Sequence, residues 1–212
     1  MKTADLIAAL SNSAKHAPPW AMTGRLAAAT AVGAAVAFAI LVGWLGLRPM
    51  HDAVLTPSFW MKGAYTLALS AAGLMWVGQL ARPTGKLGVG PVIILLIVSL
   101  MLILGGLELA RTPKTDITHA WLGDSWAVCP LRILTLATPV YLGVALTLRR
   151  LAPTRLIMTG AAAGLLAGAV GATFYGLYCR ESTAAFTATW YTLGIAASAA
   201  AGGLLGPRLL RW

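Results

Sequence analysis

"GPVIILLIVSLMLILGGLELA", residues 90–110, carries no charged side chain before Glu108. A helix of roughly 20 mostly apolar residues is long enough to cross the hydrocarbon core of a bilayer. This stretch is therefore predicted to be one transmembrane helix.

Five other stretches have similar length and composition, so that six spans are predicted: 25–47, 60–81, 88–110, 126–148, 154–178 and 184–206. Over the whole chain 58% of the residues are hydrophobic and 10% are charged, with a mean hydropathy of +0.79. A soluble domain has roughly 25% charged residues. We expect an all-α membrane protein, a bundle of six transmembrane helices whose first span is retained, because its apolar part is too long for a signal peptide.

The basic residues predict the orientation of the bundle. The net charge of +10 comes from short clusters between apolar runs, which is typical of charges that fix topology and does not indicate nucleic-acid binding. The side with the termini receives ten of the 16 Lys and Arg residues, namely Lys2, Lys15, Arg25, Arg82, Lys86, Arg149, Arg150, Arg155, Arg208 and Arg211. The positive-inside rule then places both termini in the cytoplasm, in a bacterial inner membrane.

Cys129 and Cys179, the only two cysteines, are predicted to lie at similar depth at the opposite side. Cys129 opens the fourth span and Cys179 ends the fifth, and the short segment "RRLAPTR", residues 149–155, makes these spans antiparallel neighbours. The non-cytoplasmic side of such a membrane is oxidising. A disulfide, a reactive thiol pair, a site for a soft metal ion and two small buried side chains all remain open.

Polar residues on the same side are candidates for auxiliary contacts to a metal ion. They are His51, His119 and Asp124, and no motif such as CxxC or HExxH accompanies them. No catalytic set is visible, so we expect no enzyme and no obligatory cofactor, although a transient heavy-metal ion fits the thiols.

The fifth predicted span carries a row of small residues. Small residues recur there every four positions, at Gly160, Gly164, Gly168, Ala172 and Gly176. This spacing predicts close packing of the fifth span, for example against the sixth.

Residues 1–24 are expected to be a cytoplasmic amphipathic tail, and residues 25–212 the membrane domain. In the tail, Asp5 falls in the first turn of a short helix whose apolar face is formed by Leu6, Ile7 and Leu10. This helix is expected to bind the membrane surface or a groove on a cytoplasmic partner.

Nine short motifs in order along nearly the whole chain resemble the NrsF family of six-helix inner-membrane anti-sigma factors: "MKTADLIAAL", "GLRP", "FWMKGAYTLAL", "LARP", "WAVCPLRI", "LRRLAPTR", "YGLYC", "TATWYTLGI" and "GPRLLRW". The resemblance implies a chain that holds an extracytoplasmic-function (ECF) sigma factor inactive at the cytoplasmic face. It also implies that Cys129 and Cys179 sense heavy-metal or related stress, and that the tail is the natural candidate for binding the sigma factor. The HxxxCxxC zinc signature of soluble anti-sigma domains is absent from the chain.

Two other functions agree less well with the sequence. A small metal-handling transporter or permease needs a polar route through the spans, and their interiors contain almost no ionisable groups. A thiol-disulfide membrane enzyme would be expected to carry a CxxC motif.

Overall fold

The computed structural model describes residues 20–82 and 88–211. Every regular element in these residues is helical. The elements are α2 (Trp20–Ile40), η1 (Leu41–Leu45), α3 (Met50–Ala53), α4 (Pro57–Leu80), α5 (Gly90–Arg111), α6 (Ile117–Leu122), α7 (Cys129–Arg149), α8 (Leu156–Tyr178), α9 (Ala184–Phe186), η2 (Thr187–Tyr191) and α10 (Thr192–Leu209). The candidate sigma-binding residues Asp5, Leu6, Ile7 and Leu10 lie outside the described residues.

The helices fall on the six stretches predicted from the sequence, with ends that differ by a few residues. Four helical segments are long and apolar enough to cross a membrane: Met22–Leu45, Gly90–Arg111, Cys129–Arg149 and Leu156–Tyr178. The helix α4 is of similar length but contains a lysine, and the helix from Ala184 to Leu209 is rich in small and polar residues. The chain is therefore a helical membrane protein, and crossing by the remaining two helices stays a prediction.

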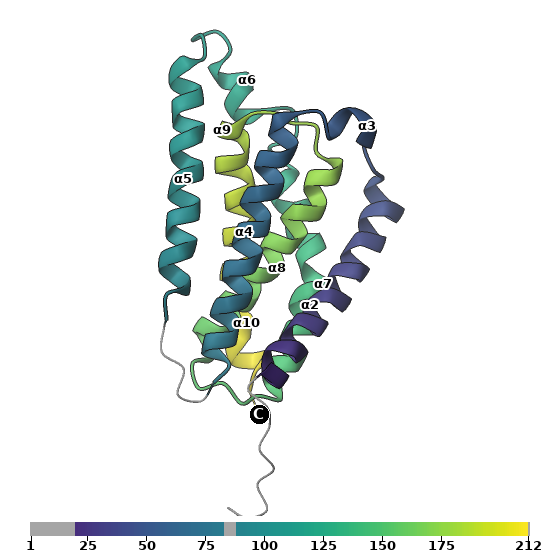
Figure 1. Ribbon diagram of the computed structural model, residues 1–212, viewed down its shortest axis with the longest axis vertical. Helices are drawn as coiled ribbons and strands as arrows, with labels where there is room; N and C mark the ends of the chain where they lie inside the picture. Colours follow the sequence, from purple (N-terminus) through teal and green to yellow (C-terminus); the bar gives the residue numbers. More distant parts are fainter. Residues whose placement is uncertain (1–19, 83–87, 212) are drawn as a thin grey trace, which may run out of the picture.

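The long helices run alternately up and down, so their ends gather at two opposite ends of the bundle (Figure 1). One end, called here the terminal end, contains the start of α2, the turn between α7 and α8 and the last turn of α10. The opposite end contains α3, α6 and α9 and is called the cysteine end, because Cys129 begins α7 there and Cys179 follows α8. All described acidic residues belong to the cysteine end, and the arginines at positions 25, 82, 149, 150, 155, 208 and 211 belong to the terminal end.

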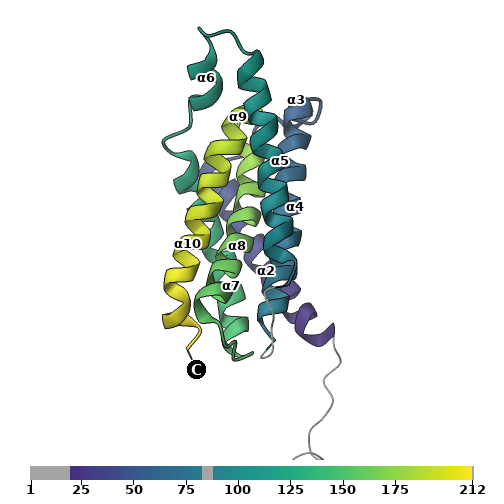
Figure 2. The ribbon, with the colours of Figure 1, turned by 90° about the vertical axis from the view of Figure 1, so that its left-hand side faces the viewer.

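The central helix is α8, which packs against α4, α7 and α10, whereas α5 lies at the edge of the bundle (Figures 1 and 2). Large apolar side chains of α5 point outward, with Leu95, Leu96 and Leu100 between 60% and 66% exposed. Such a surface suits contact with lipid tails and explains why α5 needs few helix contacts.

The predicted close packing of the fifth and sixth spans is confirmed. A Cβ atom added at Gly164 would clash with the carbonyl oxygen of Ser198, and one at Gly160 would clash with that of Gly202. The hydroxyl of Tyr141 on α7 donates a hydrogen bond to the carbonyl of Gly202 (3.0 Å), so the fourth span joins the same contact. In a membrane, where apolar burial drives helix association only weakly, this close backbone approach is a main source of stability.

Candidate functional site: a buried thiol pair at the cysteine end

The two cysteines lie in one buried cluster with Tyr175, Phe186 and Tyr191. Cys129 is fully buried and Cys179 is 2% exposed. Both are free thiols. The prediction that the two cysteines lie at the same end of the bundle is therefore confirmed, although sequence reasoning did not foresee how deeply they are buried.

Local sequence explains both positions. Pro130 follows Cys129 in the first turn of α7, where a proline has no hydrogen bond to lose and its fixed φ favours the start of a helix. Cys179 adopts an extended backbone after α8, and its N–H still donates to the carbonyl of Tyr175 (2.9 Å). The chain then continues as the 179–183 linker, which joins α8 to α9.

Lys62 is a charged residue beside the thiol of Cys179, and it is only 2% exposed. Its ammonium nitrogen donates hydrogen bonds to the carbonyl oxygen of Cys179 (3.3 Å) and to that of Glu181, and lies 4.0 Å from the Sγ atom of Cys179. It also lies 5.8 Å from the centre of the Tyr191 ring. A buried ammonium group needs such partners, because leaving water is costly for a charge.

Other elements hold the 179–183 linker and the start of α9. The guanidinium of Arg48, between η1 and α3, donates to the carbonyl of Cys179 (3.1 Å). The carboxylate of Glu108, at the end of α5, accepts a hydrogen bond from the N–H of Ala185 (2.8 Å). Together with Lys62 on α4, these contacts connect the linker and the start of α9 to three separate parts of the bundle.

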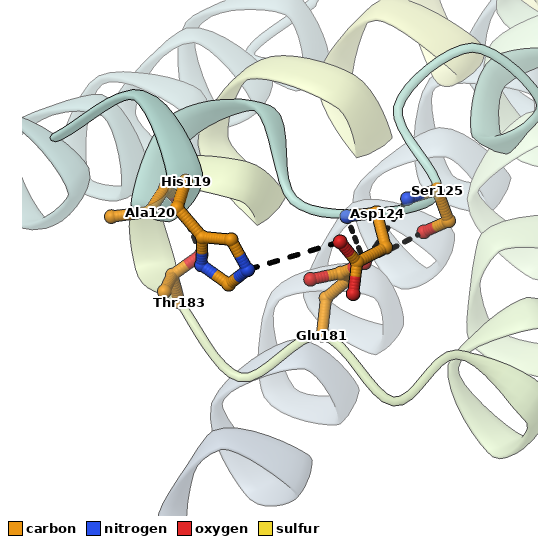
Figure 3. A network of polar contacts seen from close by, with 6 residues as sticks. All are labelled: His119, Ala120, Asp124, Ser125, Glu181 and Thr183. Carbon is orange, nitrogen blue, oxygen red and sulfur yellow. Dashed lines mark hydrogen bonds and ion pairs between the residues drawn. The ribbon is translucent and has the colours of Figure 1, made fainter. Parts of the chain in front are cut away.

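Glu181 and Thr183 connect the linker to the α6–α7 region (Figure 3). One carboxylate oxygen of Glu181 accepts hydrogen bonds from the N–H groups of Asp124 (2.9 Å) and Ser125 (3.2 Å) and from the Ser125 hydroxyl (3.1 Å). The Thr183 hydroxyl donates to the carbonyl of Ala120 (2.8 Å). The linker and the start of α9 are therefore connected to the η1–α3 segment, α4, α5 and α6.

The polar residues proposed as auxiliary metal contacts lie apart from the thiol cluster. His51 pairs with Asp52 (3.2 Å), and His119 lies 3.8 Å from Asp124, with all four side chains at least 78% exposed. Within residues 20–82 and 88–211, no group of three or more His, Cys, Asp and Glu side chains could hold a metal ion. Two buried thiols suit a soft ion with two thiolate ligands, and a role for His51, His119 and Asp124 stays a prediction.

Sequence reasoning treated Lys62 only as a charge that sets topology, and did not single out Glu181 or Arg48 as functional. The available signal was that Lys62 is the only charged residue in the 24 residues of α4. An isolated charge inside an apolar helix marks either a helix end or a buried partner, and the partner here is a segment more than 110 residues later in the chain.

We expect Lys62→Met to destabilise the bundle, since it leaves the Glu181 carbonyl without its buried donor. The loss of a charged hydrogen bond in a buried site costs about 1–3 kcal/mol. Thermal unfolding of the detergent-solubilised chain should show a lower Tm by several degrees. The matched control is Lys114→Met, which removes the same charge from an exposed position. Equal Tm values for the two variants would contradict this role of Lys62.

Comparison with known proteins shows that the chain matches one protein family. A family model described as "NrsF: Negative regulator of sigma F" matches residues 10–212. The Anti-sigma-F factor NrsF of Caulobacter vibrioides is 39% identical over 214 residues, which cover 100% of both chains. The Probable anti-sigma-F factor NrsF of Azospira oryzae is 39% identical over 215 residues, again with 100% of both chains covered. No solved structure matches the chain.

Proposed function

The chain belongs to the NrsF family of negative regulators of sigma F, and we propose that it is a membrane-bound anti-sigma factor. In this proposal it holds an ECF sigma factor at the cytoplasmic face of a bacterial inner membrane. It releases the factor when Cys129 and Cys179 meet a heavy-metal ion or an oxidant. The observation that carries the sensing part is the burial of the two thiols in one cluster beside a linker with contacts to most of the bundle.

The proposed topology has six spans with both termini in the cytoplasm. The terminal end carries seven described arginines and no described acidic residue, which is the charge distribution expected of a cytoplasmic face. The residues before α2 would form the sigma-binding tail, and Asp5, Leu6, Ile7 and Leu10 would present the contact face. No direct contact with nucleic acid is needed, because sequestration of the sigma factor is sufficient to silence its promoters.

The proposed signal acts through a change in distance between α7 and the 179–183 linker. A soft ion bound by both thiols would require both to lose their protons and would hold the two sulfur atoms to one ion. Since Cys129 begins α7 and Cys179 follows α8, the bridge moves one helix end relative to the other. A Cβ atom at Gly171 of α8 would lie 2.9 Å from the backbone of Ala137 on α7, so these helices are packed too closely to adjust locally. The displacement therefore extends toward the terminal end.

An opening between α4 and α8 supports access from the side of the bundle. A cavity of about 450 Å³ lies there, and Lys62, Gly176 and Leu177 are among the residues that line it. Neither cysteine lines this cavity, but Lys62 does, and its ammonium nitrogen lies 4.0 Å from the Sγ atom of Cys179. In this proposal, small uncharged metal complexes or oxidants approach Cys179 by this route.

The test is a reporter for the sigma-dependent promoters in strains that carry Cys129→Ser, Cys179→Ser or both. An allosteric coupling of 1–3 kcal/mol corresponds to a roughly 5- to 150-fold loss of affinity for the sigma factor. In the parent strain, Cd²⁺ should therefore switch the reporter on. We expect the double variant to keep the reporter silent with and without Cd²⁺. Silence without stress also controls for folding, because an unfolded regulator would leave the promoters active. Full induction in the double variant would exclude the thiols as the sensor.

A further inference from the structure

The helices α2 and α7 cross at a point where both backbones are in contact. A Cβ atom added at Gly33 would lie 2.6 Å from the Cα atom of Val140, and one added at Gly143 would lie 3.1 Å from the carbonyl oxygen of Ala29. Pro139, one residue before this contact, lies inside α7, where a proline removes a helical hydrogen bond and kinks the axis. The crossing therefore fixes the two helices near their middle.

A groove of about 990 Å³ extends along α2 and α7 from this crossing toward the terminal end. Its apolar wall is formed largely by Ala28, Val32 and Leu146, and Val32 and Leu146 remain 67% and 65% exposed. Both helices are candidate membrane spans, so this wall faces the lipid side of the bundle. Val32 is seven residues after Arg25, which places it roughly 10 Å deeper along the helix.

Three arginines, Arg25, Arg149 and Arg150, form the end of the groove at the membrane boundary. None of their guanidinium groups forms an ion pair or a hydrogen bond among the residues that the structure describes. Among the described residues that line the groove, none is acidic. The groove thus combines a concentrated positive charge at one end with an apolar surface at the other.

We propose that this groove binds an anionic phospholipid. The arginines bind the phosphate, because guanidinium groups donate paired hydrogen bonds to phosphate oxygens. One acyl chain lies along Val32 and Leu146. A lipid is favoured over a soluble anion or an acidic protein segment, because neither of these would cover an apolar wall that faces the hydrocarbon core. Basic pockets between transmembrane helices on the cytoplasmic side are known to bind acidic lipid headgroups. The lipid site lies at the opposite end from the thiols and does not depend on the proposed sensing function.

The experiment is thermal unfolding of the purified full chain in a neutral detergent, with added phosphatidylglycerol, phosphatidylcholine or inorganic phosphate. We expect phosphatidylglycerol to raise the Tm more than phosphatidylcholine does, and inorganic phosphate to have no effect. The variant R25Q/R149Q/R150Q should bind phosphatidylglycerol on the order of 100-fold more weakly, at about 1 kcal/mol for each arginine.

A matched control removes the same charge from the same end of the bundle. R82Q/R208Q/R211Q changes three exposed arginines that do not line the groove, and it should keep the response to phosphatidylglycerol. Native mass spectrometry of each single variant, R25Q, R149Q and R150Q, gives a second measurement if the triple variant does not fold. An equal response to both lipids, a response to inorganic phosphate alone, or equal losses in the two triple variants would overturn the proposal.

Discussion

Gly164→Ala is expected to destabilise the bundle by about 3 kcal/mol, at the upper end of the usual cost of overpacking. The added Cβ atom would clash with the carbonyl oxygen of Ser198 and lie 3.0 Å from the Cα atom of Ala199. Both neighbours are backbone atoms of α10 and cannot rotate away. The helices α8 and α10 must therefore separate along their most extensive contact, and the Tm in detergent should fall by roughly 6–12 °C.

Gly106→Ala is the matched control, because it makes the same chemical change in another long helix. A Cβ atom at Gly106 of α5 would meet nothing within 4 Å. Both substitutions gain about the same intrinsic helix propensity, about 1 kcal/mol, so the difference between them isolates the packing term. We expect an unchanged or slightly higher Tm for Gly106→Ala. If the two variants lost stability equally, the close approach of α8 and α10 would be wrong.

The second large effect is expected from the N-terminal tail. Replacing Leu6, Ile7 and Leu10 by serine removes the apolar face of the predicted short helix and leaves its length and charge unchanged. A helix of this size is marginal alone, so its binding depends on those three side chains. Burial of a leucine or isoleucine side chain contributes about 1.5–3 kcal/mol. Loss of all three is therefore sufficient to release a sigma factor that binds with micromolar or nanomolar affinity. The membrane domain should be inserted normally.

Much of the fold could be predicted from the sequence because membrane helices have a simple pattern. The stretch 90–110 predicted α5 within two residues, since an uninterrupted apolar run of this length has few alternatives. The glycine spacing predicted the contact between α8 and α10, since small residues every four positions lie on one helix face. Cys129 and Cys179 could be placed at the same end because the helices before and after residues 149–155 have similar lengths.

The arrangement around the thiols could not be predicted in the same way. Lys62 is buried only because the 179–183 linker returns over the start of α4, and no local pattern encodes that return. Glu181 accepts three hydrogen bonds from residues 124 and 125. These contacts join segments more than 50 residues apart, and each depends on the irregular backbone between helices.

The groove between α2 and α7 was also absent from the prediction. Its arginines were counted as topology charges, which is consistent with their place at the terminal end. The groove itself arises from the crossing at Gly33 and Gly143, and a crossing point depends on how two helices pack. The positive charge at the terminal end could therefore be predicted from the sequence, but the apolar wall of the groove beside it could not.

The most direct measurement for the anti-sigma function is transcription without stress in a strain that lacks this gene. The account predicts that a small group of genes with one promoter type switches on, that the full chain silences it again, and that Leu6→Ser/Ile7→Ser/Leu10→Ser does not, despite equal amounts in the membrane. Unchanged transcription together with altered metal content or tolerance would contradict the account and favour a metal-handling transporter.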